Sequence, residues 1–189
     1  MAKIKGNVIM KGVRGMLNKQ VIVKERLGTE YMCYSPQYND NRHVPEDELK
    51  NRDLFRENSK RAVALINNAE LKSLYDTFRK KGQTAYNVAM SDVSHPPKIK
   101  ALYTQGYTGK SGGTIIIHAT DNIKVTRVSI SIYDETSQLI EQGDALDNDD
   151  SLTWLFAAKI ENSHVQGCTI EAKAYDIAQN ETTLSIVIE

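Results

Sequence analysis

Cysteine, proline and tryptophan are scarce in this chain of 189 residues, which has two cysteines, four prolines and one tryptophan. Cys33 and Cys168 lie far apart in the sequence, and one bridge between them would be an unusual framework, so we expect free thiols and a reducing compartment. No apolar run reaches the roughly 18 residues of a membrane-spanning helix. The first residues also do not have the pattern of a secretory signal. We therefore expect a cytoplasmic protein, but a processed precursor would look the same, which leaves export open.

The net charge of zero conceals two halves of opposite sign. Residues 1–98 contain 18 basic and 11 acidic residues, a net of +7, whereas residues 99–189 contain 6 and 13, a net of −7. The spacing of apolar residues changes at His95-Pro96-Pro97, from a helical period to two-residue alternation. The sequence therefore predicts two domains: a basic domain at residues 1–96 and an acidic domain at residues 97–189.

The basic half begins with β structure over residues 7–35. A strand-like run at residues 20–24, a turn at 27–29 and a returning run at 31–34 predict a hairpin. Pro45 and the acidic residues that follow it favour a helix N-terminus, where proline fits the backbone and carboxylates complement the helix dipole. We expect this first helix to reach about Asn67. Its expected inward residues are Leu49, Phe55, Ala62, Val63 and Ile66.

Two further helices are predicted before the proline pair. The second has apolar residues at i, i+3, i+4 and i+7, which are Leu71, Leu74, Tyr75 and Phe78, and Gly82 marks its end. The third repeats the pattern at Tyr86, Ala89, Met90 and Val93. We interpret these side chains as packing residues, because an aromatic stripe at helical spacing is typical of a core.

The acidic half alternates apolar and polar residues, as half-buried strands do. Val128, Ile130 and Ile132 are the clearest set. Seven short strands are expected, at residues 99–103, 114–119, 125–133, 139–142, 152–158, 169–175 and 183–188. This number and spacing predict an antiparallel two-sheet β-sandwich. The fold class is therefore α+β, an N-terminal β-hairpin plus three-helix unit followed by a sandwich.

Two motifs of the acidic half resemble those of bacterial immunoglobulin-like modules. They are Ala119-Thr120-Asp121-Asn122 after one strand and Ala174-Tyr175-Asp176, continued to Asn180, near the end. The resemblance covers most of residues 97–189 and implies an immunoglobulin-like antiparallel β-sandwich. The chain departs from antibody domains, since it has no cysteine pair and Trp154 lies late, so we expect a disulfide-free module.

The order of parts along the whole chain also resembles a family of uncharacterised bacterial proteins. That resemblance rests on the glycine-punctuated basic hairpin, on residues 70–75 and 85–89, and on the proline boundary. It implies the same architecture, an N-terminal hairpin and helical region with a C-terminal immunoglobulin-like domain. It implies no reaction and no ligand.

The segment from Gly109 to Gly113 only superficially resembles a phosphate-binding loop. The fingerprint requires glycine where this chain has Thr104, and it requires a helix after the loop. Here the loop is expected to join two strands, so we interpret it as a turn.

Two groups of acidic and amide residues are candidates for calcium. One is the acidic loop with Asp147 and Asp149, and the other joins Asp121 to Asp176 and Asn180, whose turns are expected at one end of the sandwich. Asp and Asn side chains more often bond to the backbone of their own turn. We therefore predict no metal and no cofactor, and keep these five residues as secondary calcium candidates.

No catalytic constellation is visible. The four histidines, His43, His95, His118 and His164, show no ligand spacing, and no serine or cysteine has an identifiable base beside it. We therefore expect a protein that is not an enzyme. A hydrolase would need carboxylates or a histidine to converge in one cleft of the fold, which one sequence does not reveal.

The basic residues of the hairpin are the clearest indication of binding. The candidate contact residues are Lys11, Arg14, Lys19, Lys24, Arg26, Tyr31 and Tyr34. Such a surface can bind phosphates and stack bases, so a nucleic-acid-binding protein is one alternative. The same charges also suit docking onto an acidic protein surface. We favour the second reading: a non-catalytic binding or structural protein that binds a protein partner or self-associates.

Overall fold

The computed structural model describes residues 2–4, 12–26, 28–37 and 43–189. Contacts divide the chain into two compact units, Met1–Asn51 and Arg52–Glu189. The predicted α+β class is confirmed, with three helices and three antiparallel sheets among the described residues. None of the helices in these ranges has the length and apolar character that a membrane crossing requires.

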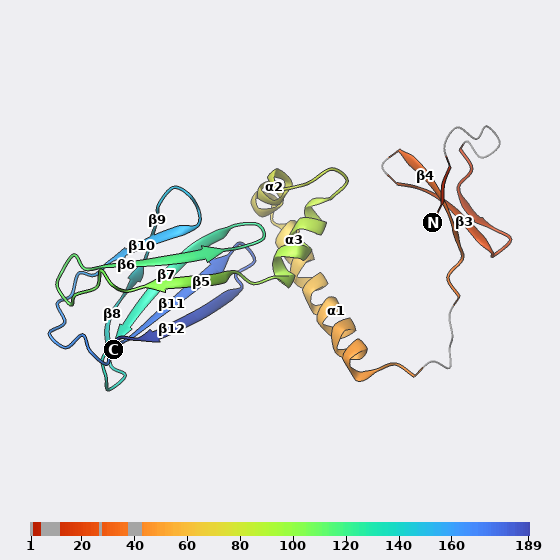
Figure 1. Cartoon of the computed structure of the whole chain (residues 1–189). Helices are drawn as coiled ribbons and strands as arrows, with labels where there is room; N and C mark the ends of the chain where they lie inside the picture. Colours follow the sequence, from red (N-terminus) through yellow and green to blue (C-terminus); the bar gives the residue numbers. More distant parts are fainter. Residues whose placement is uncertain (1, 5–11, 27, 38–42) are drawn as a thin grey trace. The chain divides into compact units, whose positions relative to one another are not determined.

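The first unit contains a four-stranded antiparallel sheet (Figure 1). Its strands are β1 (Ala2–Ile4), β2 (Gly15–Leu17), β3 (Val21–Arg26) and β4 (Thr29–Tyr34), in the order β1-β4-β3-β2. The predicted hairpin is the β3–β4 pair, and Gly28 has the positive φ of 73° that such a turn needs. Among the side chains described in this sheet, Val23 is the one that is buried.

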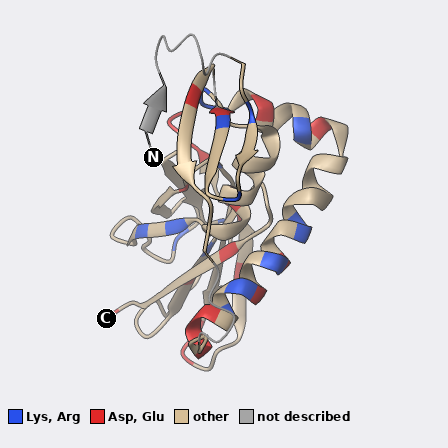
Figure 2. Cartoon of the chain, turned by 90° about the vertical axis from the view of Figure 1, so that its right-hand side faces the viewer, with Lys and Arg blue, Asp and Glu red and all other residues tan. Residues whose placement is uncertain are grey.

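Helix α1 (Glu46–Asn67) starts with the expected acidic turn, and charged residues follow along its length (Figure 2). Ala62 is buried and Ile66 is half-buried, as predicted. The inward position expected for Leu49, Phe55 and Val63 is wrong, because all three are exposed. Phe55 lies on the buried face but before Asn58, where the rest of the second unit begins to cover that face, whereas Leu49 and Val63 lie off the buried face altogether.

Two shorter helices, α2 (Ala69–Thr77) and α3 (Ala85–Ser94), pack against each other. Asn68 caps α2, since its side-chain oxygen accepts hydrogen bonds from the backbone N–H groups of Glu70 and Leu71. Thr84 and Asn87 form a reciprocal capping box at the start of α3. These caps satisfy backbone donors that the helix itself leaves unpaired.

The remaining strands form two four-stranded antiparallel sheets. They are β5 (Lys98–Tyr103), β6 (Thr114–Thr120), β7 (Val125–Tyr133), β8 (Leu139–Asp144), β9 (Leu146–Asp147), β10 (Thr153–Ala157), β11 (Thr169–Asp176) and β12 (Glu181–Val187). Their orders are β5-β6-β10-β9 and β12-β11-β7-β8. Seven of them match the predicted strands, and the two-residue β9 is the addition.

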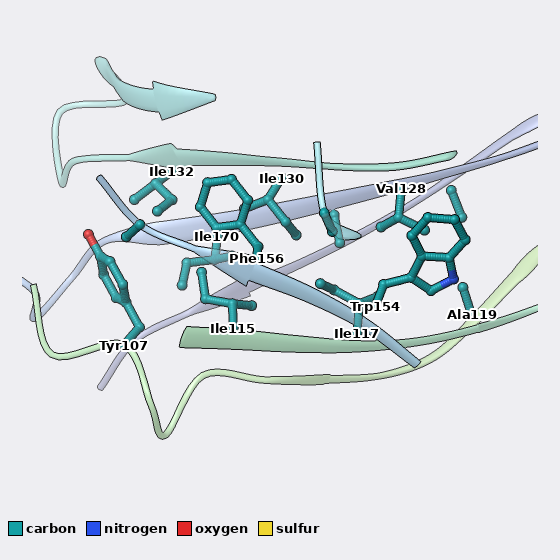
Figure 3. Close-up of a cluster of buried hydrophobic side chains, with 14 of the residues drawn as sticks. Tyr107, Ile115, Ile117, Ala119, Val128, Ile130, Ile132, Trp154, Phe156 and Ile170 are labelled. Carbon is teal, nitrogen blue, oxygen red and sulfur yellow. The ribbon is translucent and has the colours of Figure 1, made fainter. Parts of the chain in front are cut away.

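Side chains from both sheets meet in one apolar core (Figure 3). Ile115 and Ile117 of β6 and Phe156 of β10 face Ile130 and Ile170 of the other sheet. A second core joins the helices to the turn between β11 and β12, where Ile177 and Ala178 pack with residues of α1, α2 and α3. Because of this second core, helix α3 lies against one end of the sheets. An independent domain at residues 97–189 stays a prediction.

Candidate functional site

Three aspartates meet where α3 lies against the ends of the two sheets, and we call them the carboxylate cluster. Asp92 lies on α3, Asp121 follows β6, and Asp176 ends β11. One carboxylate oxygen of each lies within 4.8 Å of those of the other two. Asp92 and Asp176 are 0% exposed, and Asp121 is half-buried. Their convergence brings together residues 84 positions apart in the sequence.

Asp121 is held by its own turn. Its Oδ2 accepts hydrogen bonds from the backbone N–H groups of Ile123 (2.8 Å) and Lys124 (3.0 Å). This is the local turn bonding that the sequence analysis favoured. The other oxygen, Oδ1, is buried and has no hydrogen-bond partner in the described part of the chain.

Asp176 is held by the amide of Asn180 in the turn to β12. Its Oδ1 accepts the Asn180 backbone N–H and its Oδ2 accepts Asn180 Nδ2, both at 2.7 Å. The same Nδ2 donates to the Asp92 carbonyl oxygen at 2.9 Å, while Asn180 Oδ1 accepts a 3.0 Å bond from Arg61. These partners fix the orientation of the amide, with its nitrogen toward the carboxylates. Asn180 therefore holds the cluster in place through its nitrogen, and this orientation does not suit a calcium ligand, the role for which it was kept as a secondary candidate.

Asp92 was not among the residues singled out by the sequence analysis. Its Oδ2 accepts a 2.7 Å hydrogen bond from the hydroxyl of the buried Tyr75, and its Oδ1 has no partner among the described residues. One signal was available, because position 92 lies on the same helical face as Ala85, Val88 and Ala89. An acidic residue on an apolar face calls for a partner inside the fold.

Burial and mutual repulsion disfavour the ionised form of two of these carboxyls. Burial raises the pKa of Asp92 to about 7, and the charges of Asp176 and Asp121 add to the rise. The Tyr75 hydroxyl and the nearby Ala178 backbone amide oppose it. Burial also raises the pKa of Asp176, against the bonds from Asn180 and the charge of Arg61. A proton or a cation would relieve this excess of negative charge.

The acidic loop between β9 and β10 uses its carboxylates locally. Asp147 Oδ1 accepts the Ser151 backbone N–H at 3.0 Å. Asp150 accepts the N–H groups of Thr153 and Leu152, and these bonds lower its pKa. Asp147 and Asp149 belong to no group of three possible metal ligands among the residues the structure describes. The structure therefore does not bring these two calcium candidates to the carboxylate cluster.

The two tyrosines among the candidate contact residues do not share one face of the sheet, and Tyr31 lies beside Lys24. The β3–β4 register pairs Lys24 with Tyr31 and Val21 with Tyr34, which places the two tyrosines on opposite faces of the sheet. Arg14 forms a salt bridge with Glu25. Lys19 is exposed in the turn before β3.

Arg26 is the last residue of β3, and Lys11 lies outside the described residues. The nucleic-acid alternative stays a prediction.

The glycine-rich segment forms a turn between β5 and β6, as expected. Gly109 and Gly112 have φ values of 74° and 88°. The Gly113 N–H donates to the Lys110 carbonyl at 3.0 Å. No helix follows this loop, so its geometry is that of a strand-to-strand connection.

No family model and no curated protein matches this chain. Among solved structures, similarity is found to CopC from Methylosinus trichosporium OB3b, with 13% identity, coverage of 47% of this chain and 87% of that chain, and a TM-score of 0.37. An engineered protein solved at 1.98 Å shares 12% identity over 57% of this chain and 23% of that chain, with a TM-score of 0.33. At these TM-scores neither likeness carries an argument about ligand or function.

Proposed function

We propose that this chain is a non-catalytic assembly protein that associates with a second copy of itself through helix α1. The observation that carries the proposal is an uncovered part of the inward face of α1. Leu54 is 55% exposed and Phe55 is 61% exposed. Exposed apolar side chains that continue a buried face are typical of an interaction surface.

The helical period shows that these two residues belong to the buried face. Leu54 lies four residues before the buried Asn58, and Phe55 lies seven residues before the buried Ala62. Asn58 Nδ2 donates to Ser94 Oγ at 3.2 Å, which ties this face to α3. The face therefore continues for about one turn beyond the part that α3 covers.

The charges of α1 favour a second copy as the partner. The first turn of the helix is acidic, whereas Arg61 lies seven residues after Leu54, on the same side of the helix. Two α1 helices packed antiparallel around Leu54 and Phe55 would place each acidic first turn opposite the Arg61 turn of the other copy. Such a pair has two-fold symmetry, the commonest arrangement of homo-oligomers.

We also infer that the two sheets of the second unit form an immunoglobulin-like sandwich. Immunoglobulin domains have strands A, B, E and D in one sheet and C, F and G in the other. Lettering β5, β6, β10 and β9 as A, B, E and D reproduces the first sheet, and β12, β11 and β7 follow the order G, F, C in the second. The remaining strand, β8, lies beside C, where variable-type immunoglobulin domains have an additional strand. This match in strand order supports the inference. The sandwich would then act as a rigid support for the helices.

The accessibility of the carboxylate cluster supports a non-catalytic role. Asp92 and Asp176 are completely buried, so the side chains that most resemble an acid–base pair are closed to a substrate. Tyr75, which bonds to Asp92, is equally buried. The cluster is better suited to holding parts of the fold together.

Light scattering on the full chain tests the proposed assembly. We expect the mass of a dimer for the wild type at about 100 µM, a concentration at which micromolar association is complete. The double variant Leu54→Ser/Phe55→Ser is expected to be a monomer. Leu49→Ser is the matched control, because Leu49 is 48% exposed on the opposite side of α1. A monomeric wild type, or a double variant that remains dimeric, would contradict the proposal.

A further inference from the structure

Two buried oxygens of the carboxylate cluster lack any hydrogen-bond partner in the described part of the chain. They are Asp92 Oδ1 and Asp121 Oδ1. Asp92 is 0% exposed, so water at the molecular surface does not solvate it. Buried acceptors are almost always paired, and a buried ionised one is especially costly when it is not. Two such atoms in one cluster indicate that a partner is missing.

The nearby side chains do not supply the missing positive charge. Arg61 lowers the pKa of Asp176, but its guanidinium bonds to Asn180 Oδ1 and to the Ala178 carbonyl. Lys124 contributes its backbone N–H to the Asp121 turn. The three carboxylates therefore lie close together, and no cationic side chain among the described residues bonds to any of them. We propose that Asp92, Asp121 and Asp176 bind a hard divalent cation, and that Ca²⁺ is the ion that fits best.

The separation of the oxygens suits one ion. Oxygens bound to Ca²⁺ lie at about 2.3–2.6 Å, so two ligands on opposite sides of the ion are about 4.8 Å apart. One oxygen from each of the three aspartates lies within 4.8 Å of the others. All three can therefore contact a single ion. Ca²⁺ accepts six to eight oxygens, and bidentate carboxylates or water would complete the shell.

The chemistry of the donors selects against softer metals. The ligand group contains carboxylates alone, with no histidine or cysteine among the described residues that meet there. Zinc and copper prefer imidazole or thiolate ligands, whereas calcium, magnesium and manganese prefer oxygen. Asn180 holds Asp176 in place from behind, as residues around metal ligands commonly do.

The position of the cluster gives the ion a structural role. Asp92 belongs to α3, Asp121 to the turn between the two sheets after β6, and Asp176 to the end of β11. One ion would therefore link the helices to both sheets. Asp121 is the half-buried member of the cluster. A ligand that binds only the folded state raises its stability.

Calcium titration of the full chain after treatment with a chelator tests the site. At pH 7.5 we expect saturating CaCl₂ to raise the melting temperature by about 5 °C. Tb³⁺, which replaces Ca²⁺ and is excited through a neighbouring tyrosine, should luminesce through Tyr75. Asp121→Asn should weaken both responses at least about tenfold, because it removes one charged ligand. Asp147→Asn in the acidic loop is the matched control and should respond as the wild type does.

A further variant keeps the test independent of whether Asp121→Asn folds. Asp92→Asn has nearly the same shape, and we expect it to be more stable than the wild type in chelator and insensitive to calcium. No change of melting temperature and no terbium luminescence in the wild type would overturn the proposal. Equal responses from Asp121→Asn, Asp92→Asn and Asp147→Asn would mean an adventitious ion only. The inference does not depend on self-association through α1.

Discussion

The hydroxyl of Tyr75 on α2 donates a 2.7 Å hydrogen bond to Oδ2 of Asp92 on α3, and both side chains are completely buried. This bond joins two helices inside the second core, while Asp92 Oδ1 has no hydrogen-bond partner among the residues that the structure describes. Burial and the bond to Asp92 raise the pKa of Tyr75, so the tyrosine remains the donor at ordinary pH. The carboxylate cluster is thus anchored to the helices at Tyr75.

Loss of the Tyr75 hydroxyl should destabilise the protein. Tyr75→Phe removes the hydrogen-bond partner of a buried carboxylate, and we expect the free energy of unfolding to fall by about 1–3 kcal/mol. Tyr86→Phe is the control, because the Tyr86 hydroxyl bonds at 2.9 Å to Ser59 Oγ in a half-buried position. Urea unfolding measures both. Equal losses in the two variants would show that the Tyr75–Asp92 hydrogen bond contributes no more to the free energy of unfolding than the Tyr86–Ser59 bond does.

A charge at position 180 should be more damaging. Asn180→Asp exchanges a donor to Asp176 and to the Asp92 carbonyl for a fourth carboxylate, so we expect a loss of at least about 3 kcal/mol. Asn148→Asp makes the same chemical change in the exposed acidic loop and should alter stability by less than about 0.5 kcal/mol. Thermal and urea unfolding provide the comparison. A tolerated Asn180→Asp would contradict the bracing role of Asn180.

Stability without divalent cations should fall as the pH rises. Burial raises the pKa of Asp92 from 3.8 to about 7 in the folded chain, and the pKa of Asp176 is raised as well. Between these values the folded state binds more protons than the unfolded state, so its stability is greatest at low pH and is lost as the pH rises through about 7. In chelator, the melting temperature should therefore be higher at pH 5 than at pH 8.

Two controls assign this pH dependence to the cluster. Asp92→Asn should flatten the profile, since it removes the carboxyl group whose pKa is raised to about 7, while Tyr75 and Arg61 remain in place. Saturating calcium should also flatten the pH profile, because it stabilises the ionised carboxylates at high pH. A melting temperature that rises from pH 5 to pH 8 in chelator would contradict the prediction that ionisation of Asp92 destabilises the folded chain.

Gly109 is expected to tolerate no side chain. It has a φ of 74°, and a Cβ there would lie 2.2 Å from the Asn162 carbonyl oxygen. Gly112 has a φ of 88° but open space around a Cβ. Gly112→Ala should therefore cost only the backbone strain, about 1 kcal/mol, and Gly109→Ala at least about 3 kcal/mol. Similar losses, measured by urea unfolding, would show that the loop moves away from Asn162.

Nucleic acid is expected not to be retained by the full chain in a gel-shift titration. The Arg14–Glu25 salt bridge neutralises one basic residue of the sheet, and Tyr31 and Tyr34 lie on opposite faces, so a single face offers only one of the two tyrosines for base stacking beside Lys24. Retention that weakens steeply with added salt would instead support the nucleic-acid alternative. Single-stranded and duplex DNA at low salt make the test most sensitive.

The elements of the fold follow closely from local sequence patterns. Two-residue alternation identified β7 and β12, and helical spacing identified α2 and α3, although α2 ends at Thr77 and not at Gly82 as predicted. The strands that were not predicted individually are β1, β2 and β9. They have two or three residues each, which is too few positions to show a period. The apolar face of α1 was visible, but Phe55 shows that a period does not reveal where the neighbouring structure ends.

The candidate site was only partly accessible from sequence. The turn motifs pointed to Asp121, Asp176 and Asn180, because Asp and Asn at such positions bond to their own backbone. Asp92 joins them through the packing of α3 against the β11–β12 turn, a contact between segments more than 80 residues apart. Residue types alone do not predict that Asn180 holds the carboxylates in place, or that helix α3 supplies the third carboxylate.

A crystal structure of the full chain grown with Mn²⁺ tests the central claim most directly, because manganese accepts the same oxygen ligands as calcium and gives an anomalous signal. The account predicts an anomalous peak bonded to a carboxylate oxygen of each of Asp92, Asp121 and Asp176. A map with no peak at this position, or with Asp92 turned away from the other two aspartates, would contradict it.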